Sequence, residues 1–141
     1  MSESALHIAL VRTIRDWALG QYGPVDWGFY VLADLPESKD KPPMVCGFRP
    51  DVLARNSGTG MTLIGEAKTS QDLKITHTFA QLRAYLGYLR HVRRPVLAVA
   101  VPWQVKATTI GIVRRLLLME STKRIEWAVL AGGGVHWGHL D

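Results

Sequence analysis

The chain has 141 residues, of which 48% are hydrophobic and 21% are charged. These values exclude an intrinsically disordered chain, and the length suits one domain spanning residues 1–141 with a single core. The only cysteine excludes an intrachain disulfide, and the net charge of +5 weakly favours a polyanionic partner.

The first half of the chain predicts one helix followed by three strands. The apolar spacing indicates an amphipathic helix from Ser4 to about Leu19, which glycines at 20 and 23 terminate. Segments rich in β-branched and aromatic residues then predict strands at 25–35, 45–55 and 61–69. Cys46 falls inside the second of these strands, where we expect it to be a small core residue.

The second half alternates helices and strands. We expect helices at 74–92 and 105–121, strands at 96–101 and 123–130, and a short final strand at 135–139 after a glycine turn. The apolar run 96–103 is typical of a strand covered on both faces, and it is too short to cross a bilayer. This order predicts an α/β domain, in which a mixed β-sheet is flanked by helices.

Charged residues mark the ends of the two strands at 45–55 and 61–69. Because side chains alternate along a strand, Glu66 and Lys68 share one face, and a hairpin brings Asp51 next to Glu66. Two adjacent carboxylates repel each other, and a divalent cation with oxygen ligands resolves that conflict. The alternative is a surface hairpin with one Glu–Lys pair and an unrelated Asp.

The residues Pro50-Asp51, fourteen intervening residues and Glu66-Ala67-Lys68 resemble the signature of the PD-(D/E)xK nuclease superfamily. The resemblance implies a restriction-endonuclease-like fold with the order α-β-β-β-α-β-α-β. It also implies hydrolysis of DNA phosphodiester bonds with Mg²⁺, for which Mn²⁺ can substitute. In that family pattern Asp51, Glu66 and the backbone carbonyl of Ala67 hold the metal, and Lys68 positions or activates the attacking water.

The same resemblance implies two further members of the site. A glutamine often lies on the helix that follows Glu-x-Lys, and Gln81 occupies that place in this sequence. A glutamate from the first helix reaches the metal in several branches, which makes Glu3 a candidate ligand. Glu3 is equally well explained as an acid favoured by the helix dipole. We expect His7 on the partly exposed polar face of the same helix and not as a ligand.

The partner that the resemblance implies is DNA, with a homodimer left open. Candidate backbone contacts are basic residues close to the motif or on the following helix: Arg49, Arg55, Lys74 and Arg83. The first residues lack a signal-peptide pattern, so we expect a cytoplasmic protein without a membrane partner. Two alternatives remain, a nucleic-acid-binding module with a decayed site and an interaction subunit of a larger nuclease or defence complex.

Overall fold

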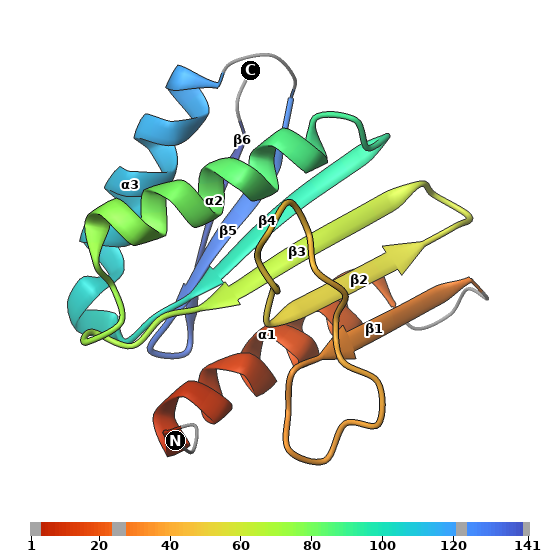
Figure 1. Cartoon of the computed structure of the whole chain (residues 1–141), viewed down its shortest axis with the longest axis horizontal. Helices are drawn as coiled ribbons and strands as arrows, with labels where there is room; N and C mark the ends of the chain where they lie inside the picture. Colours follow the sequence, from red (N-terminus) through yellow and green to blue (C-terminus); the bar gives the residue numbers. More distant parts are fainter. Residues whose placement is uncertain (1–3, 24–27, 121–123, 140–141) are drawn as a thin grey trace.

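A six-stranded mixed sheet forms the centre of the molecule, with helices on both faces (Figure 1). The structure is a computed structural model that describes residues 4–23, 28–120 and 124–139. Its helices are α1 (Ala5–Tyr22), α2 (Ile75–Leu89), the short 3₁₀ helix η1 (Trp103–Val105) and α3 (Lys106–Met119). The strands are β1 (Phe29–Ala33), β2 (Val52–Asn56), β3 (Met61–Ala67), β4 (Arg94–Ala100), β5 (Glu126–Ala131) and β6 (Gly134–His139). Within these described ranges, no helix is both long and apolar enough to span a membrane.

The strands lie side by side in chain order, β1-β2-β3-β4-β5-β6. The first three pair antiparallel, β3-β4-β5 pair parallel, and β6 returns antiparallel to β5. Helices α2 and α3 make the two crossovers that parallel pairing requires. The predicted α/β class with a mixed, helix-flanked sheet is therefore confirmed, and the predicted final strand is present as β6.

The sheet separates two apolar clusters. On one face, α2 and α3 pack over residues such as Leu53, Ile64 and Leu97. On the other face, α1 packs over Leu63, Ala98 and their neighbours. Strand β4 is buried from Pro95 to Ala100, because helices cover both of its faces.

The segment that joins β1 to β2 corrects the sequence analysis. We predicted a strand at 45–55, but β2 begins only at Val52. Val45 and Phe48 form an isolated antiparallel bridge around Cys46 and Gly47, whose φ angles are 50° and 90°. Positive φ at both central residues makes a tight turn that reverses the chain. The predicted burial of Cys46 is also wrong, because the turn exposes its side chain.

The first strand is shorter than predicted. It was expected at 25–35, and the structure has β1 at Phe29–Ala33. Residues 24–27 lie outside the described residues, and Gly28 has a φ of 95° immediately before the strand. A left-handed residue does not fit the extended backbone of a strand, which explains why β1 starts after it.

Helix α1 approaches β3 closely at Gly65, next to Glu66. A Cβ at Gly65 would lie 2.6 Å from Ile14 Cγ2 and 3.1 Å from Val52 Cβ. We therefore expect Gly65→Ala to destabilise the fold by about 1–3 kcal/mol, because the added methyl overpacks the core. Thermal unfolding measures this, with Gly20→Ala as the matched control, since a Cβ at that helical position meets nothing within 4 Å. Equal melting temperatures for the two variants would contradict the close packing of α1 on β3.

Candidate active site

Asp51 is held in place by the backbone on both sides of it. Its N–H donates to the Gly65 carbonyl at 3.1 Å, and its carbonyl accepts from the N–H of Asp34 at 2.8 Å. The side chain is fixed as well, because Oδ2 accepts from the backbone N–H of Ala67 at 2.8 Å. The carboxylate of Asp51 is therefore oriented by the end of β3, while only 7% of the residue is exposed.

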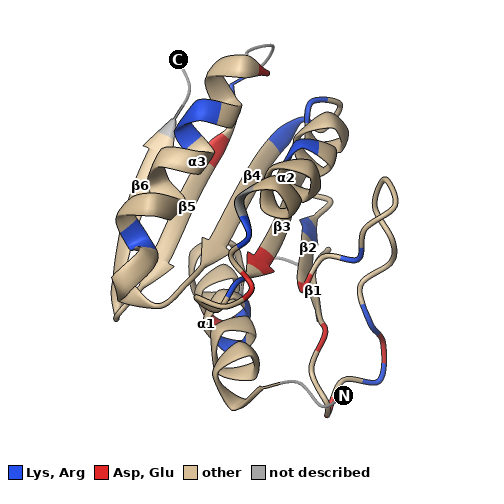
Figure 2. Ribbon diagram, turned by 60° about the vertical axis from the view of Figure 1, so that its left-hand side comes forward, with Lys and Arg blue, Asp and Glu red and all other residues tan. Residues whose placement is uncertain are grey.

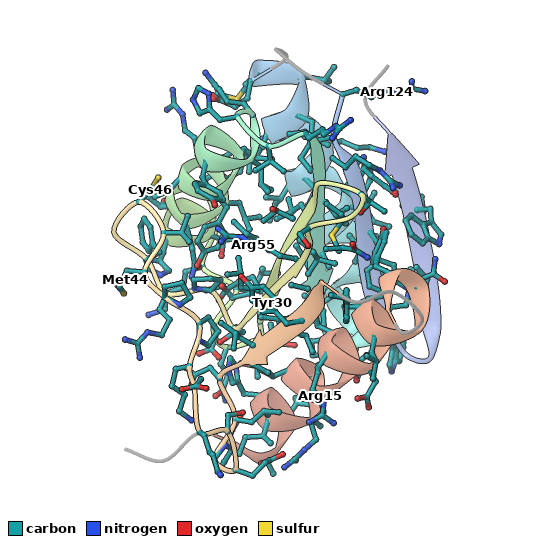
Figure 3. All side chains as sticks on the ribbon, turned by 90° about the vertical axis from the view of Figure 1, so that its right-hand side faces the viewer. Arg15, Tyr30, Met44, Cys46, Arg55 and Arg124 are labelled. Atoms are coloured by element: carbon teal, nitrogen blue, oxygen red, sulfur yellow. The ribbon has the colours of Figure 1, made fainter. Side chains whose placement is uncertain are left out.

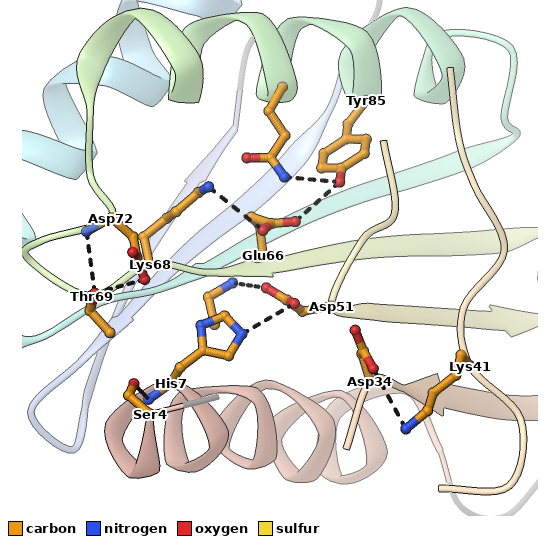
Figure 4. Close-up of polar contacts among 12 residues, drawn as sticks. Ser4, His7, Asp34, Lys41, Asp51, Glu66, Lys68, Thr69, Asp72 and Tyr85 are labelled. Atoms are coloured by element: carbon orange, nitrogen blue, oxygen red, sulfur yellow. Dashed lines mark hydrogen bonds and ion pairs between the residues drawn. The ribbon is translucent and has the colours of Figure 1, made fainter. Parts of the chain in front are cut away.

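Glu66 lies on the face of β3 that α2 covers. The β2–β3 register pairs Val52 with Gly65, which sets Asp51 opposite Glu66 on the same face. Tyr85 of α2 donates its hydroxyl to Glu66 Oε1 at 3.1 Å (Figure 4). Burial, followed by the charge of Glu66, raises the pKa of Tyr85, so that its hydroxyl stays protonated as a donor.

Gln81 lies one helical turn before Tyr85 and takes part in the same contacts. Its Nε2 donates to the Tyr85 hydroxyl at 3.3 Å. Its Oε1 is buried without a hydrogen-bond partner among the described residues. An unpaired buried acceptor is costly, so this oxygen is available to a donor that enters the site.

Lys68 completes the group from the end of β3. Its backbone N–H donates to the Ala100 carbonyl at 2.9 Å, which continues the pairing with β4. Its Nζ lies 3.9 Å from Glu66 Oε2, and only 8% of the side chain is exposed. The ammonium group is therefore held near the two carboxylates with little access to bulk water (Figure 4).

His7 is a site residue that the sequence analysis missed. We expected it on the partly exposed polar face of the first helix without a role in the site, but its Nε2 lies 3.4 Å from Asp51 Oδ1, and 15% of its side chain is exposed. Ser4 caps α1 by accepting the N–H of His7 at 3.0 Å, and the His7 side chain in this first turn lies beside Asp51, just before β2 (Figure 4). Only the packing of α1 on the sheet reveals this contact.

A cavity of about 390 Å³ opens beside these groups. Its lining includes Glu66, Ala67 and Lys68 on β3 and the segment directly after it. His7 comes from α1, and polar residues before or at the start of α2 complete the wall: Asp72, Lys74 and His77. The buried carboxylate of Glu66 is thus reached from solvent through a mouth that carries both positive and negative groups.

The electrostatics of the site centre on Glu66. Burial raises the pKa of Glu66 well above its ordinary value, and the neighbouring Asp51 raises it further by its charge and by a hydrogen bond between the two side chains. Lys68 and the Tyr85 hydroxyl oppose that rise without cancelling it. The environment therefore disfavours a second negative charge beside Asp51, which is the situation that a bound cation relieves.

The donor set fits a hard divalent cation. Asp51 and Glu66 supply carboxylate oxygens, and the Ala67 carbonyl points toward the Asp51 side of β3, as its N–H does. The unpartnered Oε1 of Gln81 adds an acceptor for a coordinated ligand or a substrate group. Within the part of the chain that is described, no group of three or more His, Cys, Asp or Glu side chains converges. Two carboxylates with a carbonyl leave room for water and phosphate oxygens, as is usual for Mg²⁺.

The structure brings together Asp51, Glu66, Lys68 and Gln81, and it places the four basic candidates apart from one another. Lys74 lines the cavity mouth, and Arg49 is exposed on the segment before Asp51. Arg83 lies on the outside of α2, where its Nε bonds Glu120 Oε2 at 3.1 Å. Arg55 lies further along β2 in a different cavity. The remaining candidate, Glu3, lies outside the described residues.

The surface charge follows the same scattered pattern. Basic residues are spread over α1, α2, α3 and the segment between β1 and β2 (Figure 2).

Comparison with protein-family models, with curated proteins and with solved structures found no match. The functional argument therefore depends on the geometry of the site itself.

Proposed function

We propose that the protein is a metal-dependent nuclease that hydrolyses phosphodiester bonds in DNA, with a restriction-endonuclease-like fold. The observation that carries the proposal is the meeting of Asp51, Glu66 and Lys68 at the ends of adjacent strands, beside a cavity that Glu66 and Lys68 line. Buried carboxylates that a cation would neutralise, next to a buried ammonium group, suit a reaction at a phosphate.

In this proposal each residue of the site has its own role in metal binding, water positioning or orientation. Asp51, Glu66 and the Ala67 carbonyl would hold Mg²⁺ or Mn²⁺, which supplies Lewis-acid stabilisation of the charge that develops on the phosphate. Lys68, whose Nζ lies 3.9 Å from Glu66 Oε2, orients the attacking water or pairs with a phosphate oxygen. Gln81 offers Oε1 to a donor in the site, and Tyr85 holds the Glu66 carboxylate in one orientation.

A cleavage panel tests the proposal. Supercoiled, linear, single-stranded and four-way DNA are incubated with Mg²⁺, with Mn²⁺ and with a chelator. We expect cleavage of at least one substrate that needs the metal. DNA binding without cleavage under all metal conditions would favour a decayed binding module, and neither binding nor cleavage would favour an interaction subunit.

His7 gives a separate test of the metal site. Since it contacts Asp51, the substitution His7→Ala should free that carboxylate to rotate and weaken the apparent affinity for Mg²⁺ by about 10–100-fold. Cleavage rates measured over a range of Mg²⁺ concentrations report the change, and saturating Mg²⁺ should restore most of the rate. His91→Ala is the control, because His91 is exposed just beyond the far end of α2. An unchanged metal dependence in His7→Ala would show that the contact does not position Asp51.

A further inference from the structure

A second cavity, of about 440 Å³, lies at the opposite end of β2 and β3 from the acidic pair. Its lining contains Tyr30, Arg55 and Thr62, together with glycines and small polar residues around the β2–β3 turn. None of its described lining residues is acidic. The second cavity therefore lacks the acidic groups that the first cavity contains.

Arg55 is the charged group of this second cavity, and its partners are neutral. Its Nη2 donates to the Tyr88 hydroxyl of α2, and Tyr30 of β1 is its direct cross-strand neighbour. Among the described residues, the ion pairs include no carboxylate for Arg55. A guanidinium carries five donors, so the Tyr88 phenol orients it while leaving donors for an anion.

The surroundings of Arg55 suit a nucleotide. Tyr30 is 44% exposed, which leaves its ring accessible to a base, and Figure 3 shows Tyr30 near Arg55 on the side of the β1 edge. The stem of Arg93 lies against Gly60, where a Cβ would come within 2.7 Å of Arg93 Cδ. A second positive side chain thus lies against Gly60, which lines the same cavity.

The register relates this cavity to the acidic pair. Tyr30 pairs with Arg55 and Arg55 with Thr62, and all three share the sheet face that carries Asp51 and Glu66. Arg55 is four positions after Asp51, which corresponds to roughly 13 Å of extended strand. Successive phosphates of a strand advance about 3.4 Å along a duplex axis, so a few nucleotides cover this distance.

From these observations we infer that the cavity around Arg55 and Tyr30 is a second subsite for the nucleic-acid substrate. It binds a phosphate a few nucleotides from the one that is cleaved. The inference rests on the proposed nuclease function and adds where a distant part of the substrate is held. Arg55 supplies the charge, Tyr88 fixes its orientation, and the ring of Tyr30 contacts a base.

The test compares a long and a minimal substrate. Binding of a single-stranded oligonucleotide of about 12 nucleotides is measured by fluorescence anisotropy in the Glu66→Gln background, where the substrate stays intact. Arg55→Ala should raise Kd about 5–20-fold and reduce the slope of log Kd against log salt by about 1. Tyr30→Phe should weaken binding less than Arg55→Ala, because it removes only a neighbouring hydroxyl and keeps the ring. Arg12→Ala is the matched control, since Arg12 lies on α1 and its guanidinium is engaged by Glu37.

Catalysis separates a subsite from a structural role. With the Glu66 side chain intact, Arg55→Ala should lower kcat/KM for the long oligonucleotide and leave the rate on bis(p-nitrophenyl) phosphate unchanged, because that ester covers only the reacting centre. The same oligonucleotide is also tested with a 5′-phosphate. If this phosphate strengthens binding by the protein that has Arg55 but not by Arg55→Ala, the subsite takes a terminal phosphate. Equal binding with and without the 5′-phosphate would show that it takes an internal one.

Three results would overturn the inference. Wild-type Kd and salt slope in Arg55→Ala would show that Arg55 touches no phosphate. Equal losses on the oligonucleotide and the small ester would show that the substitution only disturbs the fold. A wild-type protein that neither binds nor cuts DNA would overturn both this inference and the nuclease proposal. If either of the first two results is found while the wild type still cuts DNA with metal, the nuclease proposal stands and only the subsite is wrong.

Discussion

Asp51→Asn and Lys68→Met should each lower metal-dependent DNA cleavage by about 10³-fold or more. Asp51 is the carboxylate that β3 itself orients, through the Ala67 N–H at 2.8 Å. Lys68 brings an ammonium group to the same site, with Nζ 3.9 Å from Glu66 Oε2. Removal of either charge leaves a site that cannot both hold the cation and present a positive group to the phosphate.

Both substitutions are chosen to keep the fold. An asparagine at position 51 retains an oxygen that accepts the Ala67 N–H, so this hydrogen bond to the backbone persists. A methionine at position 68 retains most of the buried stem of the lysine and leaves no large cavity. Unfolding curves close to those of the wild type should therefore accompany the lost activity.

The segment between β1 and β2 supplies matched controls. Lys39→Met and Asp40→Asn make the same chemical changes at exposed positions of that segment, and each should cleave at the wild-type rate. Measured rates over single turnovers, at saturating Mg²⁺, distinguish the four variants. Wild-type cleavage by Asp51→Asn or by Lys68→Met would remove these residues from the reaction and with them the proposed site.

The alternation of side chains was sufficient to predict much of this site. Residues 61–65 are β-branched or apolar with turn formers before them, which predicts a strand that continues to Glu66 and Lys68 and puts both on one face. A short hairpin then leaves few registers, and the observed one sets Asp51 opposite Glu66. Gln81 was expected only from the resemblance, and the structure buries it on α2 beside Tyr85.

Other parts could not be predicted because they depend on packing between distant segments. His7 meets Asp51 only because Gly65 admits Ile14 and fixes the height of α1 above β3. The tight turn at Cys46 and Gly47 carries strand-like residues on both sides, so its composition favoured the wrong prediction. Arg55 was a candidate because it is near the motif in sequence, but strand geometry carries it to the other end of the face.

Glu66→Gln should stabilise the metal-free protein at neutral pH while it abolishes stabilisation by Mg²⁺. Burial, together with Asp51, raises the pKa of Glu66 even after the favourable contacts with Lys68 and Tyr85 are included. The folded site therefore favours an uncharged side chain at position 66, and glutamine supplies one that still accepts the Tyr85 hydroxyl. We expect a gain of about 1–2 kcal/mol, which corresponds to a rise in Tm of roughly 3–8 °C for a chain of this size.

The sign of the pH dependence follows from the same shift. Below the ordinary Glu pKa of 4.5, Glu66 is protonated in both the folded and the unfolded chain, so Glu66→Gln should change stability little. As the pH rises above that value, the unfolded chain ionises first and the wild type loses stability until the folded pKa is passed. The advantage of the variant should therefore grow with pH over this window.

Glu37 provides a control of opposite sign. Hydrogen bonding to its own backbone, followed by Arg12, lowers the pKa of this exposed glutamate, so Glu37→Gln should not stabilise the protein at neutral pH. Thermal unfolding at several pH values, with and without Mg²⁺, measures all three proteins. Added Mg²⁺ should raise Tm for the wild type and for Glu37→Gln but not for Glu66→Gln, because binding to the folded state alone stabilises it. A Glu66→Gln protein that melts below the wild type at neutral pH would mean that Glu66 is adequately compensated without a cation, and the electrostatic case for a metal at Asp51 and Glu66 would fail.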